Sequence, residues 1–491
     1  MNALLVVLRR VFMVCVFGLS VSASAWAGPE HGGVSPGPLT ALEKLQSAPA
    51  LIAERDKTPA VHVSLARWTT AEGLRVMWSR NTQLPLLDVR LVFDAGAARE
   101  GELSGAAVAV SDLLDEGTQT RSAQQVAEGF EQIGANFTTA SYRDMALVSL
   151  RVMSDAARRD AATSLLSEVV SQPRFAADDW QRLQESMRLN LRQRMQSPAG
   201  RAGQTFYQSL YGNHPYSRMP GGDTGSIERM TPADIAAFHQ RYYTAKNGVL
   251  VLVGDITRAD AEMLATRLSR ALPVGEKAPA LPAVMPLAKA ERVHQVFSSE
   301  QVHIVLGEVG ISRTDPDYFA LMVGNELLGG SGFGTLLTRE LREKRGLTYS
   351  VTSQFIPMRA AGPFQISFST RHDQATEALA LTRQLLSDFV RQGPTEADVS
   401  AAKANLSQAF PRSVASNDQV ASFLAMIGFY ELPDSFIDDY IGQLAAVDLA
   451  QVRAAMSRHI HPERLLVVTV GRLDAKATKA DSKATRWRLL K

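Results

Sequence analysis

Residues 249–254 read Val-Leu-Val-Leu-Val-Gly and residues 466–471 read Leu-Val-Val-Thr-Val-Gly, so two apolar segments that end in glycine lie 217 residues apart. Short apolar runs bounded in this way are typical of buried β-strands. Two earlier pairs of segments repeat at a spacing close to 214 residues. In the first pair, the strand pattern of 86–94 returns at 302–308. In the second pair, the helix end at 112–117 returns at 326–331. Three registers that agree within a few residues predict a duplicated unit.

Within each half, the pattern runs strand, helix, strand, long helices, strand. Helical apolar spacing covers 155–171 and 178–196 in the first half and 375–392 and 396–410 in the second. This order predicts an α+β fold with two homologous domains, each a mainly antiparallel sheet with helices on one face. Two such layers facing each other would enclose a cavity.

The chain has 491 residues, enough for several domains and sizeable cores. Residues 273–291 contain four prolines and predict an extended linker, because proline lacks an N–H and fixes φ. We predict a signal peptide at 1–27, a loose leader at 28–50 and a first domain at 51–272. The linker at 273–291 is followed by a second domain at 292–480 and a tail at 481–491.

Charge and cysteine content exclude two classes of protein. Lys and Arg number 52 against 50 Asp and Glu, a balance that provides no field to hold nucleic acid. The single cysteine, Cys15, rules out a disulfide framework or a cysteine-rich zinc or iron–sulfur site.

The first 27 residues predict a Sec-type signal peptide. Arg9 and Arg10 precede an apolar run over 11–19 and a small-residue exit at 25–27. An uncleaved anchor is the alternative, but the run is shorter than the ~20 residues that a span needs. We therefore expect a periplasmic protein with no membrane span after cleavage.

Residues 105–118 read Gly-Ala-Ala-Val-Ala-Val-Ser-Asp-Leu-Leu-Asp-Glu-Gly-Thr. The frame resembles the G-x-A-H-x-x-E-H-x-x-x-x-G-T helix of the pitrilysin/insulinase family of zinc peptidases, the inverzincins, of the processing-peptidase-like type. In that family the two histidines bind Zn²⁺, the glutamate between them is the general base, and a distant glutamate completes the ligand set. Here Val108, Ser111 and Asp112 occupy the working positions, and Arg188 or Leu189 falls at the distant one. The resemblance implies that this chain holds neither metal nor other cofactor.

Two other groups could suggest a metal on composition alone. Asp112 has helical spacing to Asp115 and Glu116, but oxygen-only pairs on an exposed helix are usually solvated or capping groups. His214 precedes Pro215-Tyr216 in a loop similar to one common in the family, and we expect it to be a structural hydrogen-bonding residue.

The second half keeps the family's most characteristic segment. Residues 335–351, Thr-Leu-Leu-Thr-Arg-Glu-Leu-Arg-Glu-Lys-Arg-Gly-Leu-Thr-Tyr-Ser-Val, place Arg342 and Tyr349 where the family presents an arginine and a tyrosine to bound peptide. A helix through Arg342 is predicted to stop at Gly346 and lead into a strand that carries Tyr349. A guanidinium and a neutral phenol can both donate to the scissile carbonyl and its oxyanion. Without the resemblance, a solvated helix face and a core-edge aromatic explain the two residues.

Further substrate contacts are expected at Gly329 and Gly330, and at Asn136 and Thr138. The glycines open a segment that we interpret as a hinge or substrate-facing loop, because no Lys-Ser/Thr follows to make a phosphate loop. Residues 134–144 resemble the family's edge strand that pairs with substrate. The equally weighted alternative is a half-buried strand with Tyr142 packed.

The resemblance implies a zinc-less subunit of a heterodimeric metallopeptidase. Arg342 and Tyr349 would bind unfolded peptide while a homologous partner with an intact HxxEH helix supplies zinc, so the chain alone would be inactive. A non-proteolytic peptide-binding or scaffold protein of the same fold is the first alternative. An independent hydrolase with Ser111 as nucleophile is the second, although no G-x-S-x-G elbow surrounds that serine.

Overall fold

The computed structural model describes residues 62–332, 334–473 and 488–490. The predicted signal peptide and leader lie outside these residues. No helix within the described ranges is both long enough and apolar enough to cross a membrane.

The first sheet has six strands in the spatial order β1-β2-β6-β3-β5-β4. Neighbouring strands are antiparallel except β2 and β6, which are parallel. In this order the bounds are Ala66–Thr69, Arg75–Arg80, Gly248–Gly254, Leu86–Phe93, Ala146–Met153 and Asn136–Ser141.

The second sheet has the order β12-β7-β11-β8-β10-β9. Strand β7 runs parallel to both of its neighbours, and the remaining pairs are antiparallel. The bounds are Arg488–Leu490, Glu291–Val296, Leu466–Gly471, Gln301–Val309, Pro363–Arg371 and Val351–Phe355. Part of the predicted tail, residues 488–490, therefore belongs to the sheet of the second half.

The two sheets repeat the same topology. Strands β2, β6, β3, β5 and β4 have the same order and relative directions as β7, β11, β8, β10 and β9. Helices follow the same repeat, since α4 (Ala106–Leu113), α6 (Ala156–Ser171) and α7 (Ala177–Gln196) correspond in order to α12 (Tyr318–Gly329), α13 (Ala375–Gln392) and α14 (Glu396–Ala409). The prediction of an α+β fold made of a duplicated unit is confirmed.

The glycine that ends both quoted segments has a structural reason. Gly254 and Gly471 have φ of +135° and +147°, a region that residues with a Cβ rarely adopt. A Cβ at Gly254 would lie 2.1 Å from the carbonyl oxygen of Leu86 on the neighbouring strand. Both strands therefore need glycine where they turn away from the sheet.

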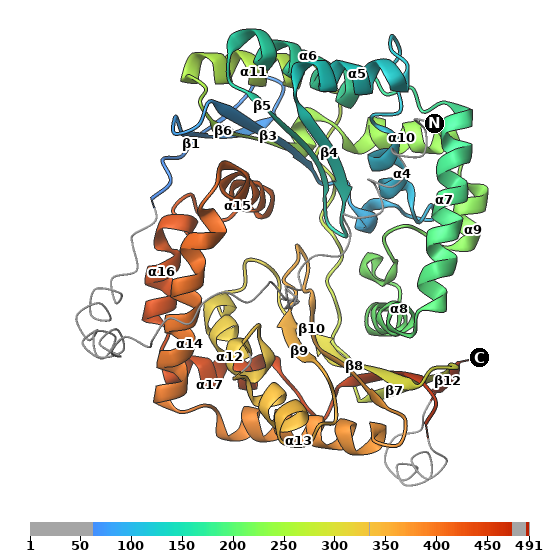
Figure 1. The fold of residues 1–491 in the computed structure, drawn as a ribbon, viewed down its shortest axis with the longest axis vertical. Helices are drawn as coiled ribbons and strands as arrows, with labels where there is room; N and C mark the ends of the chain where they lie inside the picture. Colours follow the sequence, from blue (N-terminus) through green and yellow to red (C-terminus); the bar gives the residue numbers. More distant parts are fainter. Residues whose placement is uncertain (1–61, 333, 474–487, 491) are drawn as a thin grey trace, which may run out of the picture. The chain divides into compact units, whose positions relative to one another are not determined.

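Helices α5 (Ala123–Ile133), α6 and α11 (Arg258–Ala271) cover one face of the first sheet (Figure 1). This agrees with the predicted layer of helices on one face of the sheet. Helix α15 (Asn417–Tyr430), from the second half, packs on β6 and β3 from the other side, and α8 (Pro198–Tyr211), from the first half, packs on β11 and β8. The other α-helices of the described residues are α9 (Thr224–Arg229), α10 (Pro232–Tyr242), α16 (Phe436–Ala446) and α17 (Leu449–His459).

Strand β6 explains why a second helix layer is needed. All seven of its residues are buried, and successive side chains point to opposite faces of the sheet. Leu250 and Leu252 pack in the core of the first half, whereas Val249, Val251 and Val253 join a core made mainly by the second half. An apolar face on each side of the sheet requires an apolar cover on each side.

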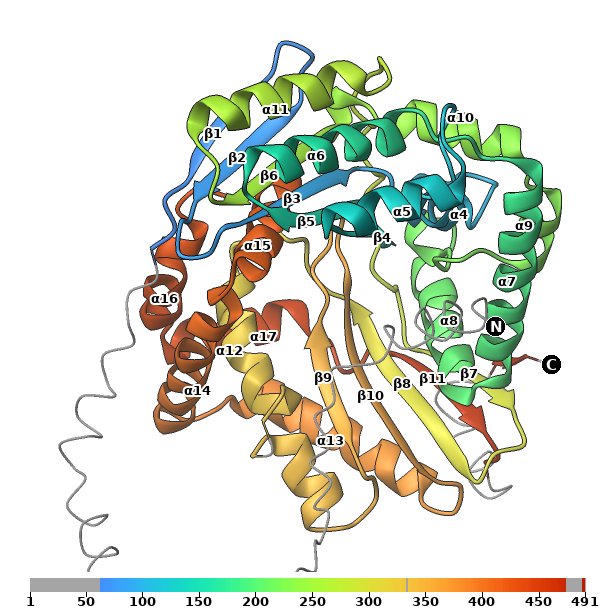
Figure 2. The ribbon, with the colours of Figure 1, turned by 45° about the horizontal axis from the view of Figure 1, so that its top comes forward.

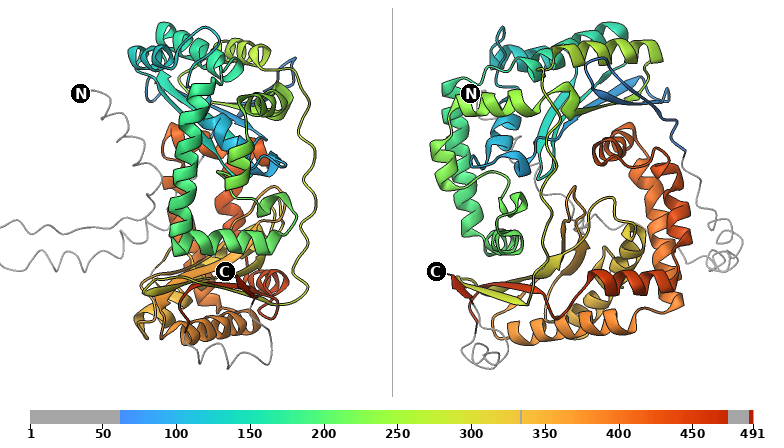
Figure 3. Two further views of the ribbon diagram at one scale, coloured as in Figure 1. Left: turned by 90° about the vertical axis from the view of Figure 1, so that its right-hand side faces the viewer. Right: turned by 180° about the vertical axis from the view of Figure 1, so that it is seen from behind.

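Residues 273–290 contain no helix or strand, as the prolines predict, and Figure 3 shows them as a long extended trace. Figure 2 shows the second sheet with β9 at its edge, next to β10. Strand β4 is the corresponding edge of the first sheet.

Candidate functional site

Helix α4 carries the three positions at which the family motif has changed. Gly105, with φ of +101°, begins the helix, and a Cβ there would lie 3.1 Å from the Cα of Gly222. Val108 is half-buried, Ser111 is buried and Asp112 is exposed. The helix keeps the glycine that frames the family motif, but it carries no histidine.

The chemistry of these positions does not suit zinc or a nucleophile. The Ser111 hydroxyl is buried and forms no hydrogen bond with a described residue, so no base is within reach to activate it. This argues against the independent hydrolase. The position of the distant ligand is occupied by Arg188 or Leu189, and neither a positively charged guanidinium nor an apolar side chain binds a cation.

A group of three potential metal ligands does come together elsewhere in the described ranges. The group consists of Asp315, Asp317 and His459. One carboxylate oxygen from each aspartate and one ring nitrogen of the histidine lie within 4.8 Å of one another. His459 Nε2 is 2.8 Å from Asp317 Oδ2, and Arg458 pairs with the same carboxylate. Hydrogen bonds within the protein account for this cluster.

The structure brings Arg342 and Tyr349 together. The guanidinium carbon of Arg342 lies 5.1 Å from the centroid of the Tyr349 ring, within cation–π range. Arg342 is half-buried, whereas Tyr349 is 83% exposed. A large aromatic side chain held in this way is available to a ligand, and the alternative of a core-edge aromatic is wrong.

The local fold differs from the prediction in one respect. Arg342 lies on the π-helix η4 (Thr338–Glu343), and Tyr349 lies in a bend two residues before β9 rather than on the strand. The helix ends at Glu343, and the predicted stop residue, Gly346, follows after a two-residue turn. The φ of Gly346 is +60°, and its N–H donates to the Arg342 carbonyl at 3.0 Å.

Glu340 fixes the cations around this helix end. Its carboxylate accepts hydrogen bonds from Lys344 Nζ and Arg345 Nη1, both at 2.7 Å. These bonds, with a weaker one from Arg339, lower the pKa of Glu340 to about 2. Three of the positive charges next to Arg342 are thus held by one carboxylate.

Gly329 and Gly330 allow close packing rather than a hinge. Neither has a positive φ. A Cβ at Gly329 would lie 2.8 Å from Ser353 Oγ on β9, and one at Gly330 would lie 2.4 Å from Glu326 Oε2. Gly329 lets α12 approach the edge strand, and Gly330 leaves room for the Glu326 side chain of the same helix. The predicted contact of both glycines with substrate is untested.

Asn136 and Thr138 lie on β4, which is an edge strand as the resemblance implies. Strand β5 pairs with one side of β4, and no strand of the described residues pairs with the other. Phe137 points to the opposite face and stacks on Phe130 of α5 at 4.9 Å. Tyr142 follows the strand and is 53% exposed, so the packed-tyrosine alternative is wrong.

Behind Asn136 and Thr138, the sheet face is polar. Asn136 is opposite Arg151 on β5, which is opposite Asp88 on β3. The next row runs from Thr138 through Ser149 to Arg90. Arg151 donates to both oxygens of Asp88 at 2.9 and 3.2 Å, and Arg90 donates to Asp418 of α15 at 2.6 Å. Burial raises the pKa of Asp88, and Arg151 partly offsets this shift.

Comparison with known proteins identifies the family. Residues 75–219 match the family model described as Insulinase (Peptidase family M16), and residues 229–406 match the model described as Peptidase M16 inactive domain. The chain belongs to peptidase family M16. An uncharacterized zinc protease of Mycobacterium bovis is 26% identical over 420 residues, which cover 84% of this chain and 94% of that protein. The uncharacterized zinc protease YmxG of Bacillus subtilis is 22% identical over 81% of this chain and 96% of its own length.

Two solved structures share the fold. The peptidase M16 inactive domain from Pseudomonas fluorescens is 38% identical, with a TM-score of 0.81, over 84% of this chain and 99% of that one. A protease from Helicobacter pylori is 20% identical, with a TM-score of 0.77, over 83% of this chain and 100% of that one. The match of residues 229–406 to a model described as an inactive domain is consistent with a non-catalytic subunit.

Sequence reasoning missed the polar network that joins the two halves of this M16 chain. Asp144, which is buried, accepts hydrogen bonds from the Tyr216 hydroxyl at 2.5 Å and from the Arg359 backbone N–H at 2.7 Å. His214 fixes the segment that carries Tyr216. Its Nδ1 accepts a hydrogen bond from the Tyr216 N–H at 3.1 Å, and its Nε2 donates to the Pro282 carbonyl at 3.0 Å. The structural role predicted for His214 is confirmed.

Glu100 was also missed. Its side chain lies under the start of α4, where Oε1 accepts from the Ala107 N–H at 3.1 Å and Oε2 has no described partner. Burial raises the pKa of Glu100 to about 8, so the carboxyl is largely protonated at neutral pH. A lone glutamate before a helix gives no sequence signal for such burial.

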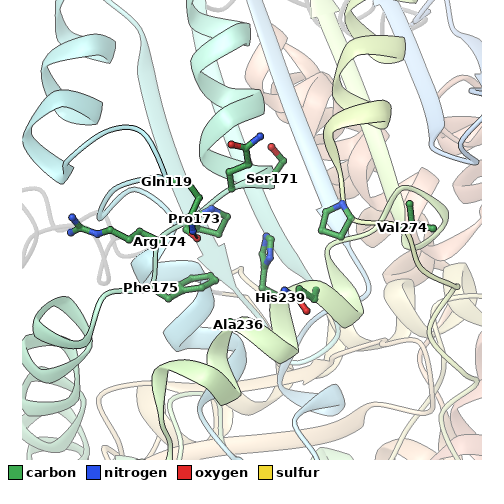
Figure 4. Close-up of a pocket in the computed structure, with 11 residues that line it drawn as sticks. Gln119, Ser171, Pro173, Arg174, Phe175, Ala236, His239 and Val274 are labelled. Atoms are coloured by element: carbon green, nitrogen blue, oxygen red, sulfur yellow. Dashed lines mark hydrogen bonds between the residues drawn. The ribbon is translucent and has the colours of Figure 1, made fainter.

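A cavity of about 470 Å³ lies in the first half, and none of the predicted site residues lines it. Figure 4 shows the residues that line this cavity. Its wall includes Phe175, with an unusual φ of +48°, and the buried His239. His239 Nε2 donates to the Val170 carbonyl at 2.8 Å, and burial lowers the pKa of this imidazole to about 4. His239 is therefore neutral at physiological pH and bonds the end of α6.

Proposed function

We propose that this protein is the non-catalytic subunit of a heterodimeric periplasmic zinc metallopeptidase. Arg342 and Tyr349 bind the peptide and its scissile carbonyl, and a homologous partner subunit with an intact HxxEH helix supplies the zinc site. The observation that carries the proposal is the contrast between the two halves. The Arg342–Tyr349 pair is kept and Tyr349 is exposed, while Val108, Ser111 and Asp112 replace all three motif residues.

The edge strand β4 supports a peptide ligand. Its outer side offers backbone donors and acceptors to an extended chain, which can add to the sheet as another strand. Pairing of this kind depends on the backbone, so it does not require particular side chains at Thr138 and Thr139. An unfolded peptide is the substrate that can adopt this conformation.

The test is reconstitution with the HxxEH-bearing homologue from the same source. The two chains should co-elute on size exclusion as a heterodimer, and a quenched fluorescent peptide should be cleaved rapidly only by the mixture. A mixture that contains the Tyr349→Phe variant should form the same heterodimer but cleave slowly. Full cleavage by the partner alone would overturn the proposal. Full cleavage with the Arg342→Ala/Tyr349→Phe double variant would instead favour the scaffold alternative.

A further inference from the structure

A small hollow lies on the polar face of the first sheet, directly behind the edge strand β4. Its volume is about 60 Å³, far below the several hundred Å³ of a pocket for a free small molecule. It accommodates the end of one side chain. The walls include Asn136 and Thr138 at the edge, Ser149 as the floor, and Arg90, Arg151 and Asp418 on the far side.

The register explains why the hollow exists. Ser149 stands between Thr138 and Arg90 in one cross-strand row, and its short side chain leaves a gap between the long neighbours. A strand added to β4 continues this row, since strands are about 4.8 Å apart and alternate side chains share a face. The peptide residue next to Thr138 therefore points its side chain across β4 toward the hollow.

The hollow contains more hydrogen-bond donors than acceptors. Each arginine has five N–H groups. Arg90 uses only Nη2, for Asp418, and Arg151 uses Nε and Nη2, for Asp88. Nη1 of both residues makes no hydrogen bond with a described residue. Arg151 is the more accessible of the two, because 40% of its side chain is exposed against 12% for Arg90.

Both aspartates are already engaged, but to different degrees. Asp88 is nearly buried and gives both oxygens to Arg151. Asp418 gives one oxygen to Arg90, lies 3.9 Å from Arg151 and is 54% exposed. The two aspartates and two arginines have no net charge together. An entering carboxylate is therefore not repelled, and it can accept hydrogen bonds from the guanidinium N–H groups that no described residue uses. A basic side chain finds only the exposed oxygen of Asp418.

We infer that the hollow is a specificity site that accepts an acidic side chain from a peptide bound along β4. This inference rests on the proposed function, because it needs the peptide to pair with the edge strand. Arg151 is the principal contact, and Arg90 and Asp418 position the site.

The test measures binding of labelled ten-residue extended peptides to the mature chain by fluorescence anisotropy. Glu, Gln or Lys is placed at each position of one host sequence in turn. At one position Glu should bind about tenfold more tightly than Lys, a difference of 1.4 kcal/mol, with Gln between them. Substituting Arg151 would leave Asp88 buried and unpaired, so the first variant is Ser149→Val, which fills the hollow and keeps both ion pairs.

Ser149→Val should abolish the Glu preference, and the matched control Thr139→Val, on the opposite face of β4, should retain it. Asp418→Asn should strengthen Glu binding severalfold, because it removes the competing carboxylate. A preference for Lys, or a Glu preference that survives Ser149→Val, overturns the inference. If peptides bind without side-chain preference and backbone N-methylation weakens their binding, the inference of a specificity site is overturned but pairing with the edge strand is not. If no peptide binds, the proposal that peptides pair with the edge strand is overturned as well.

Discussion

The hydroxyl of Tyr430 donates to Oδ2 of Asp144 at 3.1 Å, across 286 residues of sequence. Tyr430 ends α15 in the second half, and Asp144 lies between β4 and β5 in the first. Tyr216 donates to the other oxygen of the same carboxylate. One buried aspartate therefore connects the helix that covers the first sheet with the loop that follows its edge strand.

Tyr430→Phe should destabilise the protein by about 1.5–3 kcal/mol, the usual contribution of a hydrogen bond to a charged group. Urea unfolding followed by circular dichroism measures the change as a lower midpoint with an unchanged slope. Tyr142→Phe is the matched control, because Tyr142 is two residues from Asp144 and half exposed. Equal stability of the two variants would contradict the role given to the Asp144–Tyr430 bond.

Two helix glycines should respond to alanine in opposite directions. A Cβ at Gly428 of α15 would lie 2.6 Å from Val249 Cγ1 and 2.7 Å from Met77 Sδ, so Gly428→Ala should cost about 1–3 kcal/mol through overpacking. Gly442, inside α16, has no neighbour within 4 Å of such a Cβ, and Gly442→Ala should stabilise by about 0.5–1 kcal/mol. Thermal melts of both variants test the close approach of α15 to the sheet.

The sequence was informative where local pattern decides structure. The buried strands, the long helices of both halves and the stop residue Gly346 follow from apolar spacing and from glycine. It could not show that α8 and α15 pack on the sheet of the other half, because an apolar helix face does not specify its partner. The π-turn before Tyr349 was likewise invisible, since one added residue in a helix leaves no compositional trace.

Site residues divide in the same way. Arg342, Tyr349 and the β4 edge could be identified because a motif places them. Asp144, Tyr216 and Tyr430 lie far apart along the chain and meet only through tertiary packing. Arg151 and Asp88 are ordinary charged residues in alternating strands, and only the register of β3, β5 and β4 brings them behind the edge.

Glu100 should make stability depend on pH. Its folded-state pKa, about 8, exceeds the ordinary value of 4.5, so its contribution is fully present below pH 4.5 and is lost as the pH rises toward 8. Glu100→Gln keeps the acceptor for the Ala107 N–H and removes the ionisation. The variant should gain thermal stability relative to the wild type from pH 5 to pH 8, with the gain levelling off above pH 8. A difference between the two melting temperatures that stays constant over this range would contradict the burial of a protonated Glu100.

Chelation should separate this chain from its proposed partner. Because Val108, Ser111, Asp112 and Arg188 provide no zinc ligand set, 1,10-phenanthroline should leave the melting temperature of the isolated chain unchanged. The same treatment should abolish peptide cleavage by the reconstituted mixture, and added Zn²⁺ should restore it. A fall of the isolated chain's melting temperature, together with stoichiometric zinc by mass spectrometry, would contradict the loss of the metal site.

Tyr349→Phe should lower kcat of the reconstituted peptidase about 10²–10³-fold, the range measured when one oxyanion donor is removed. The variant loses only a hydroxyl on a side chain that is 83% exposed, so its melting temperature should not change. Arg342→Lys keeps the charge but loses the planar donor fork, and we expect a loss of similar size. Arg371→Ala is the control, because Arg371 is exposed and pairs with Asp373. A rise in KM at constant kcat would show that the pair only holds the peptide, because stabilisation of the transition state must appear in kcat.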